Sequence, residues 1–293
     1  MISFNKKVAS KEDATIKYIF DVNGQMVEFS YIDNGTDKDI ICVPCQTMCN
    51  MKCTFCHLTD HIGKIPTKNL HNLEITEGIE FIIEDLKLGK RTLLISFMGS
   101  GEPLANIDNI IDTMVMLNRY YPNIRFGLAT MLPKKYSHEF HKLMFEVIKY
   151  DLKVKLHLSM HFVDDEQRKE WMPSALGLEP SILMLKLYRS LTGNPIEVHY
   201  TIMKDVNDTR YHLDNLHRMV DNQTTIKFMM FSEKESLDVV KSDEDRLEKE
   251  MKWLKNEGKI VEYYKPPGND IGSSCGQFLF ELDKKKKDEF NVY

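Results

Sequence analysis

Short apolar runs alternate with segments of helical period along most of this chain, and that alternation constrains the fold more than any other feature. Parallel strands connected by right-handed helical crossovers produce this order. A closed eight-unit barrel usually needs about 250 residues, and the repeats here number nearer six, so we expect an α/β fold with a partial (β/α)6 barrel. The apolar runs are 40–43, 92–97, 124–129, 154–158, 196–202, 226–231 and 260–264, and the helical segments are 76–88, 106–120, 138–149, 181–190, 211–220 and 243–256.

A β-hairpin precedes the alternation. Segments 15–22 and 25–32 are rich in β-forming residues, and the Asn23-Gly24 dipeptide between them is the one that a type I′ turn prefers. We therefore expect three parts: an N-terminal hairpin extension (1–38), the partial barrel (39–265) and a C-terminal tail (266–293). Thr76 and Asp243 are expected to cap the first and last helices of the barrel.

The composition is that of a soluble globular protein. Of the 293 residues, 42% are hydrophobic and 28% are charged, which excludes a disordered or fibrous chain. No stretch approaches the roughly 18 apolar residues of a membrane span, and the N-terminus has no secretory pattern, so we expect a cytoplasmic protein without membrane contact. A net charge of −5 argues against broad electrostatic attraction to nucleic acid.

Five of the six cysteines lie within fifteen residues, and this clustering points to metal binding or catalysis rather than to a disulfide scaffold. Cys49, Cys53 and Cys56 form a CxxxCxxC triad just after the first predicted barrel strand. Three thiolates at this spacing can hold one [4Fe-4S] cluster and leave its fourth iron without a protein ligand. The alternatives are chance clustering and a zinc site that also uses Cys45 or His57, although zinc ligands usually come as two separated pairs.

The triad, with Phe55 before its last cysteine, resembles the signature of the radical S-adenosylmethionine (SAM) superfamily. The resemblance implies a [4Fe-4S] cluster that chelates SAM, reductive cleavage to a 5′-deoxyadenosyl radical, and an external electron donor such as flavodoxin or ferredoxin. Segment 97–104 resembles the superfamily's GGEP-like motif. Gly101, Glu102 and Pro103 are then expected to bind SAM, with Glu102 accepting a hydrogen bond from its ammonium group.

Further segments resemble one subgroup, the RlmN/Cfr family of RNA adenine methyltransferases, in order from about residue 15 to 280. Cys42 occupies the place of an extra reactive cysteine, and segment 268–277 resembles the family's GDDI…ACGQ segment, whose cysteine, here Cys275, carries the methyl group. The resemblance adds Glu28 as a catalytic residue, and Ser159, His161 and Asn207 as cofactor-binding residues.

Each of these residues also has an ordinary alternative role. Cys42 lies on an apolar strand and can be an inert buried thiol. Ser159 and Asn207 can cap or turn the chain, His161 can be a hydrogen-bonded structural residue, and Glu28 can lie on the solvated face of a hairpin.

The resemblance implies methylation of an adenosine in rRNA or tRNA, at carbon 2 in preference to carbon 8. Cys275 takes a methyl group from one SAM, and a second SAM supplies the radical that removes hydrogen from it. The methylene radical crosslinks to adenine, and Cys42 then forms a disulfide with Cys275 and releases the methylated base. The base must leave its stack to react.

One departure from the family is the start of the chain, because the hairpin begins about fifteen residues in, where relatives carry a helical RNA-binding domain. A partner that replaces this domain is therefore expected. Two alternative functions stay open: a radical SAM enzyme acting on a small molecule or peptide, and a zinc-stabilised adaptor without enzymatic activity.

Overall fold

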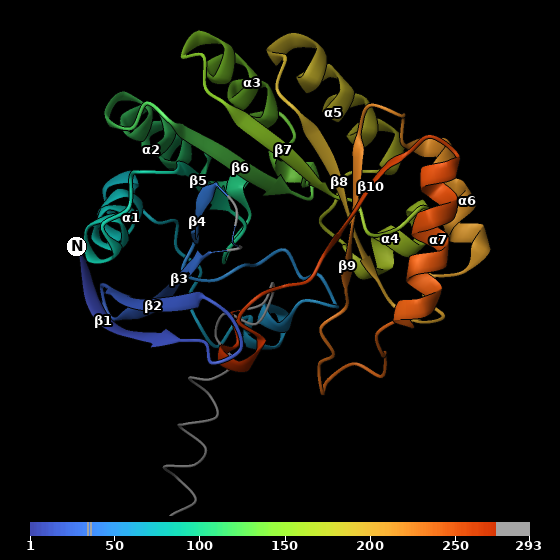
Figure 1. Ribbon diagram of the computed structural model, residues 1–293, viewed down its shortest axis with the longest axis horizontal. Helices are drawn as coiled ribbons and strands as arrows, with labels where there is room; N and C mark the ends of the chain where they lie inside the picture. Colours follow the sequence, from blue (N-terminus) through green and yellow to red (C-terminus); the bar gives the residue numbers. More distant parts are fainter. Residues whose placement is uncertain (34, 36, 274–293) are drawn as a thin grey trace, which may run out of the picture.

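A single ten-stranded sheet runs through the protein in the order β1 to β10 (Figure 1). The computed structural model describes residues 1–273 except 34 and 36. The strands from β4 to β10 pair in parallel, and six helical crossovers connect them, which confirms the expected α/β partial barrel. The parallel strands are β4 (Lys38–Cys42), β5 (Thr92–Phe97), β6 (Ile124–Thr130), β7 (Val154–Ser159), β8 (Ile196–Ile202), β9 (Thr225–Met230) and β10 (Ile260–Tyr264).

Helices cover the outer face of the parallel sheet (Figure 1). Because side chains alternate across a strand, one face presents buried apolar residues such as Ile95, Phe126 and Leu156 to the helices. The helices are α1 (Asn72–Leu86), α2 (Ile107–Tyr120), α3 (Glu139–Lys149), α4 (Asp165–Trp171), α5 (Leu178–Thr192), α6 (Arg210–Met219) and α7 (Glu244–Asn256), with short 3-10 turns η1 (His57–His61), η2 (Pro103–Asn106), η3 (Lys134–Tyr136) and η4 (Asn269–Ile271). None of the helices in the described part of the chain has the length and hydropathy of a bilayer span.

The N-terminal extension has three strands rather than the two of the expected hairpin. β2 (Thr15–Val22) and β3 (Gln25–Ile32) pair across a turn where Asn23 and Gly24 have φ values of +53° and +82°, as a type I′ turn requires. The additional strand, β1 (Ile2–Ala9), pairs antiparallel with β2 at the edge of the sheet. Its mostly exposed residues leave a weak strand pattern in the sequence.

One of the two predicted helix caps is correct. Asp243 caps α7, because its carboxylate accepts a hydrogen bond from the Arg246 N–H at 2.9 Å. The other is wrong: α1 begins four residues earlier than Thr76, and His71 is its N-cap. A capping box accounts for the difference, since Glu74 accepts from the His71 N–H at 2.9 Å.

Candidate functional site

The cysteine triad lies in the loop that leaves the carboxyl end of β4, where β/α barrels place their chemistry. Two contacts hold this loop in place. The Thr54 N–H donates to the Trp171 carbonyl at 2.9 Å, and the buried Lys234 ammonium donates to the carbonyls of Thr54 and Cys56 at 2.9 and 3.2 Å. The loop is therefore anchored to α4 and to the segment after β9.

The three thiols of the triad are buried, and burial raises the pKa of each of them. Burial, followed by the charge of Cys56, raises the pKa of the Cys49 thiol to about 12. Burial and the neighbouring thiols raise the pKa of Cys53 well above its usual value, and burial raises the pKa of Cys56 although Lys234 opposes the change. Ligation requires thiolates, and the positive charge of a bound iron–sulfur centre would lower these pKa values, so the donor set is compatible with such a centre.

One alternative is a zinc site that a fourth cysteine of the same segment completes. Cys45, the possible fourth zinc ligand, is buried and donates to the Ser100 carbonyl at 3.5 Å.

The Gly-Ser-Gly loop after β5 is bonded directly to the cysteine loop. The N–H groups of Cys45 and Gln46 both donate to the Ser100 carbonyl, at 2.9 and 3.1 Å. Gly101 has a φ of +108°, and a Cβ at this position would lie 2.6 Å from the Cys45 sulfur. Only glycine fits this close approach, so the two motifs form one structural unit.

Glu102 is the N-cap of η2 and is buried, and Pro103 is the first residue of the turn. Its carboxylate accepts from the Thr130 hydroxyl at 2.5 Å and from the N–H groups of Leu104 and Met131 at 3.1 and 3.2 Å. Burial raises the pKa of Glu102 to about 7, although these hydrogen bonds lower it. An ammonium group beside it would favour the ionised form, so Glu102 fits the expected role toward SAM.

The predicted residues at the ends of β7 and β8 form a hydrogen-bonded network. His161, with a φ of +56°, accepts at Nδ1 from the Thr201 N–H at 3.0 Å, and its ring meets Phe55 edge-on at 5.1 Å. Asn207 donates to the carbonyls of His161 and Thr201 at 2.8 and 2.7 Å. The Ser159 carbonyl accepts from Arg168 at 3.0 Å. These contacts give His161 and Asn207 structural roles, and direct binding of SAM by the three stays a prediction.

The N-terminal extension contributes a buried polar face to the site. Cys42 on β4 is the register partner of Ser30 on β3. Glu28, two residues before Ser30 and on the same face, is 4% exposed and lies 3.7 Å from the buried Lys17 ammonium. Glu28 is thus not a solvated hairpin residue.

The chain returns to this face after β10 (Figure 1). The Gly268 N–H donates to Asp13 at 2.8 Å, and Asp270 accepts from the Ser10 hydroxyl at 2.7 Å. The Ser30 hydroxyl, on the register partner of Cys42, donates to the Ser273 hydroxyl at 3.5 Å. Cys275 and its expected disulfide with Cys42 lie outside the described residues.

Arg168 is a buried residue of the site that is not among the predictions. Its guanidinium donates to the carbonyls of Ser159, Met131 and Leu176 at 3.0 to 3.1 Å and also to that of Met160. Burial lowers the pKa of Arg168 to about 10. Its position in a charged amphipathic segment indicates a surface residue, so no sequence signal marks this role.

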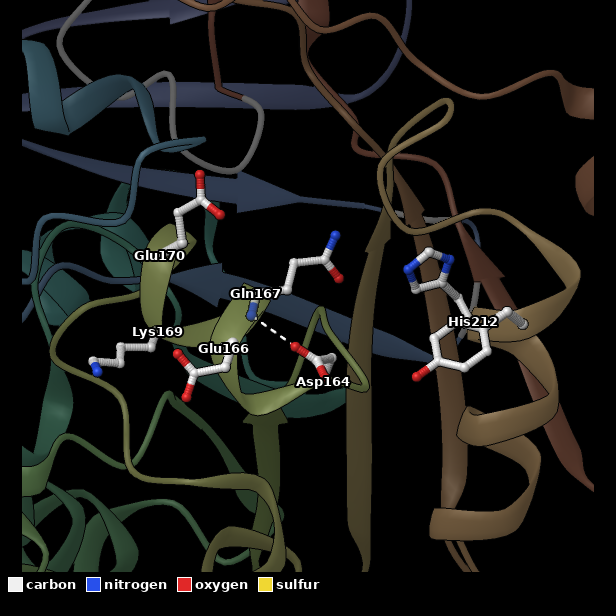
Figure 2. A pocket seen from close by; sticks show the side chains of 7 residues that line it. Asp164, Glu166, Gln167, Lys169, Glu170 and His212 are labelled. Atoms are coloured by element: carbon white, nitrogen blue, oxygen red, sulfur yellow. Dashed lines mark hydrogen bonds between the residues drawn. The ribbon is translucent and has the colours of Figure 1, made fainter.

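A separate open cavity of about 600 Å³ lies between α4 and α6 (Figure 2). Its charged residues are three acidic and one basic, which disfavours an RNA backbone there, and its lining includes none of the predicted site residues. It is lined by Asp164, Glu166, Gln167, Lys169, Glu170, Tyr211 and His212.

Comparison with known proteins agrees with this geometry. Residues 43–216 match the radical SAM superfamily. The chain is 29% identical over 286 residues to the probable dual-specificity RNA methyltransferase RlmN of Clostridioides difficile (strain 630), covering 94% of this chain and 79% of that protein. It is also 29% identical to the protein of the same name from Clostridium perfringens (strain 13 / Type A), over 95% of this chain and 79% of that protein.

Among solved structures, the fold resembles that of a radical SAM methyltransferase from Sphaerobacter thermophilus. The TM-score is 0.81 at 22% identity, and the match covers 94% of this chain and 80% of that one. The chain therefore belongs to the radical SAM superfamily, and its relatives confirm the resemblance to the RlmN/Cfr family.

Proposed function

We propose that this protein methylates an adenosine of rRNA or tRNA, at carbon 2 in preference to carbon 8, through a methylated-cysteine intermediate. Relatives that align with nearly the whole chain are named RNA methyltransferases, which supports RNA as the substrate. In this proposal Cys49, Cys53 and Cys56 hold a [4Fe-4S] cluster, and Glu102 holds the ammonium group of SAM. When bound, these cofactors supply the one-electron chemistry that yields a 5′-deoxyadenosyl radical.

The observation that carries the proposal is the contact between Ser273 and Ser30. The reaction needs the sulfur of Cys275 to reach that of Cys42. Ser273 is buried, and its hydroxyl lies 3.5 Å from that of Ser30, the register partner of Cys42. Two further residues span at most about 7 Å when extended. This reach supports a meeting of Cys275 and Cys42 on the polar face of the N-terminal extension.

Each cysteine then has a distinct task. Cys275 carries the methyl group as a thioether, and the 5′-deoxyadenosyl radical would take a hydrogen atom from it. The resulting carbon radical would bond to the adenine ring, which would then lose its ring proton and pass one electron to the oxidised iron–sulfur cluster that Cys49, Cys53 and Cys56 would hold. The Cys42 thiolate attacks the sulfur of Cys275, so an S–S bond forms as the S–C bond breaks. The electron pair stays on the released carbon, and a proton completes the methyl group. We assign Glu28 a part in these proton transfers, since it lies beside Ser30 on the same buried face.

The proposal includes two kinds of partner. An external electron donor such as flavodoxin or ferredoxin reduces the enzyme. The net charge of −5 gives the protein little general attraction to the phosphates of RNA. We therefore propose a second partner that helps the protein to bind RNA. The cytoplasm, where thiols stay reduced, is the compartment that suits this chemistry.

The test is anaerobic turnover of the reconstituted protein with SAM, a reducing system and purified rRNA and tRNA. We expect 2-methyladenosine, 5′-deoxyadenosine, and S-methylcysteine at position 275 by mass spectrometry. Cys275→Ala should abolish methylation, whereas Cys45→Ala, which removes a buried thiol outside the proposed chemistry, should retain it.

Methylation of RNA by the Cys275→Ala variant would refute the proposal. Release of 5′-deoxyadenosine without S-methylcysteine would indicate action on a small molecule or peptide. One zinc per chain and no iron after reconstitution would indicate the adaptor.

A further inference from the structure

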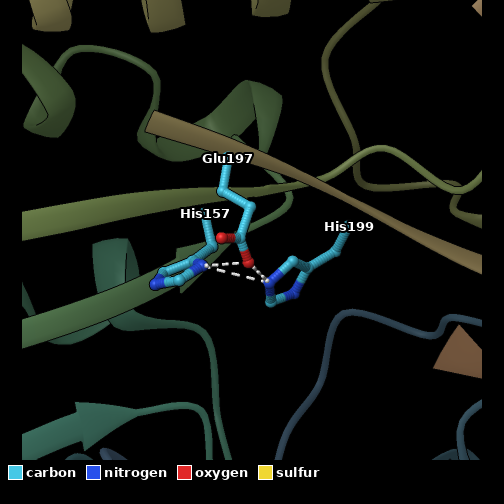
Figure 3. Close-up of side chains that lie close together, drawn as sticks. All are labelled: His157, Glu197 and His199. Atoms are coloured by element: carbon cyan, nitrogen blue, oxygen red, sulfur yellow. Dashed lines mark hydrogen bonds and ion pairs between the residues drawn. The ribbon is translucent and has the colours of Figure 1, made fainter. Parts of the chain in front are cut away.

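A second buried polar group lies on the inner face of the barrel, apart from the cysteine loop and Glu102 (Figure 3). His157 on β7 is the register partner of Glu197 on β8, and His199 follows Glu197 by two residues, so all three side chains project from one face. Oε1 of Glu197 lies 3.1 Å from Nδ1 of His157 and 2.9 Å from Nε2 of His199. Glu197 is fully buried.

The charges around this group argue against a metal ion, although its donor atoms lie within 4.8 Å of one another. Two lysines already compensate Glu197: Lys155 forms an ion pair with it, and Lys227 lies 2.6 Å from the same Oε1 that faces the histidines. Lys227 also pairs with Glu262 at 3.3 Å. Two carboxylates thus balance two ammonium groups. A divalent cation would leave a buried excess of two positive charges and would have to displace Lys227.

The protonation of His157 follows from its neighbours. Burial lowers the pKa of His157 to about 3 and also lowers the pKa of His199. Burial alone would raise the pKa of Glu197, but the hydrogen bonds from the two histidines outweigh it and lower that pKa. Nδ1 of His157 lies 3.1 Å from Oε1 of Glu197 and also 3.0 Å from Nε2 of His199. Because an ionised carboxylate can only accept, we assign the hydrogen of the neutral His157 ring to Nδ1, where it bonds to Glu197, and this assignment leaves a lone pair on Nε2.

That lone pair is directed to the layer of the barrel that contains Cys42. Nε2 of His157 lies 3.2 Å from the position that a Cβ would occupy on Gly127, and the Ser96 hydroxyl lies 3.6 Å from the same point. Ser96 is the register partner of both Cys42 and Gly127. Because neighbouring strands lie about 4.8 Å apart, the Cα atoms of Cys42 and Gly127 are about 10 Å apart. Met98 also lies 3.7 Å from the Cβ position of Gly127, so the absence of a side chain on Gly127 lets the His157 ring approach the strand beside Ser96.

We propose that His157, positioned by Glu197, accepts a hydrogen bond from the exocyclic amino group of the substrate adenine and thereby selects adenine. The inference rests on the proposed function, since Cys42 marks the layer in which the base reacts. A lone pair at Nε2 attracts the N6 amine of adenine and repels the O6 carbonyl of hypoxanthine or guanine. A buried acceptor that loses its donor is left unpaired, so the discrimination is large.

The first test reads the tautomer of His157 and needs no turnover. In the reconstituted full chain with ¹⁵N-labelled histidine, long-range NMR correlations should show a neutral ring with hydrogen on Nδ1, assigned by its absence in His157→Gln. Adenosine 5′-monophosphate should shift the Nε2 resonance, and inosine 5′-monophosphate should not. A ring with hydrogen on Nε2, a protonated ring at pH 7, or equal shifts with both nucleotides would overturn the inference.

The second test compares RNA fragments that differ only in adenosine or inosine at the methylated position. The wild-type protein should prefer adenosine by at least about 100-fold in kcat/KM. His157→Leu should reduce this ratio at least tenfold, His157→Gln, which keeps an acceptor, should restore part of it, and the surface control His138→Gln should not change it. An unchanged ratio in His157→Leu would overturn the inference.

Measurement of the metal content tests the alternative that His157, Glu197 and His199 bind a metal ion. Iron and zinc per chain should be the same in the wild type and in His157→Leu, and loss of one bound ion in the variant would overturn the inference in favour of a metal site. A wild-type protein that methylates no RNA would count against the proposed function, and the tautomer and nucleotide measurements would still decide the role of His157.

Discussion

Replacing Gly101 by alanine should uncouple the Gly-Ser-Gly loop from the cysteine loop. Two costs follow from the geometry. With a φ of +108°, the backbone is strained for any other residue, which costs on the order of 1–2 kcal/mol. The new Cβ would also lie 2.6 Å from the Cys45 sulfur and 2.8 Å from Gln46. Overpacking of this kind costs about 1–3 kcal/mol, so the free energy of unfolding should fall by about 2–5 kcal/mol.

Gly63→Ala is the matched control. Gly63 has a φ of +83° but nothing within 4 Å of its Cβ position, so it should lose only the backbone cost of about 1–2 kcal/mol. Anaerobic urea unfolding of both variants measures the difference. Iron content and the absorbance of the reconstituted cluster should fall in Gly101→Ala and not in Gly63→Ala. Equal unfolding free energies in the two variants would show that the close approach of the loops is not the constraint.

Three further predictions concern buried polar groups. Burial raises the pKa of Glu102 to about 7 in the folded protein. The unfolded chain ionises this carboxyl near pH 4.5, so the free energy of unfolding falls as the pH rises from about 4.5 to about 7. Without SAM, Glu102→Gln should therefore gain up to about 3 kcal/mol relative to the wild type over that range; a pH-independent difference would contradict this. Asn207→Ala breaks hydrogen bonds to His161, Thr201 and Met203 and should lower the free energy of unfolding by about 2–4 kcal/mol in chemical denaturation. A decrease below about 1 kcal/mol would refute the structural role of Asn207. Arg168→Met leaves buried carbonyls at the ends of β6 and β7 unpaired and should cost about 3–5 kcal/mol, measured in the same way, with an unchanged midpoint as the contrary result.

The local pattern was sufficient to predict the barrel strands and the turn at Asn23-Gly24. Parallel strands covered by helices bury one full face, so each appears as a short apolar run, as in 92–97 and 196–202. The edge strand β1 has no such signal, because its residues are mostly exposed. Thr76 is a common capping residue, but the choice of His71 depended on Glu74 closing a capping box.

For the site, the sequence by itself determined the chemistry of the donors: three thiols at a cluster spacing after a strand, and a glutamate after a glycine-rich turn. Only the tertiary structure decided what surrounds them. Strand register placed His157 beside Glu197, which is 40 residues away in the chain. The segment from Gly268 to Ser273 packs against the N-terminal extension, and this contact brings Ser273 to Ser30, the register partner of Cys42. Short-range patterns reflect local backbone geometry, whereas burial and pKa shifts arise from residues distant in the chain, so they exist only once the chain is folded.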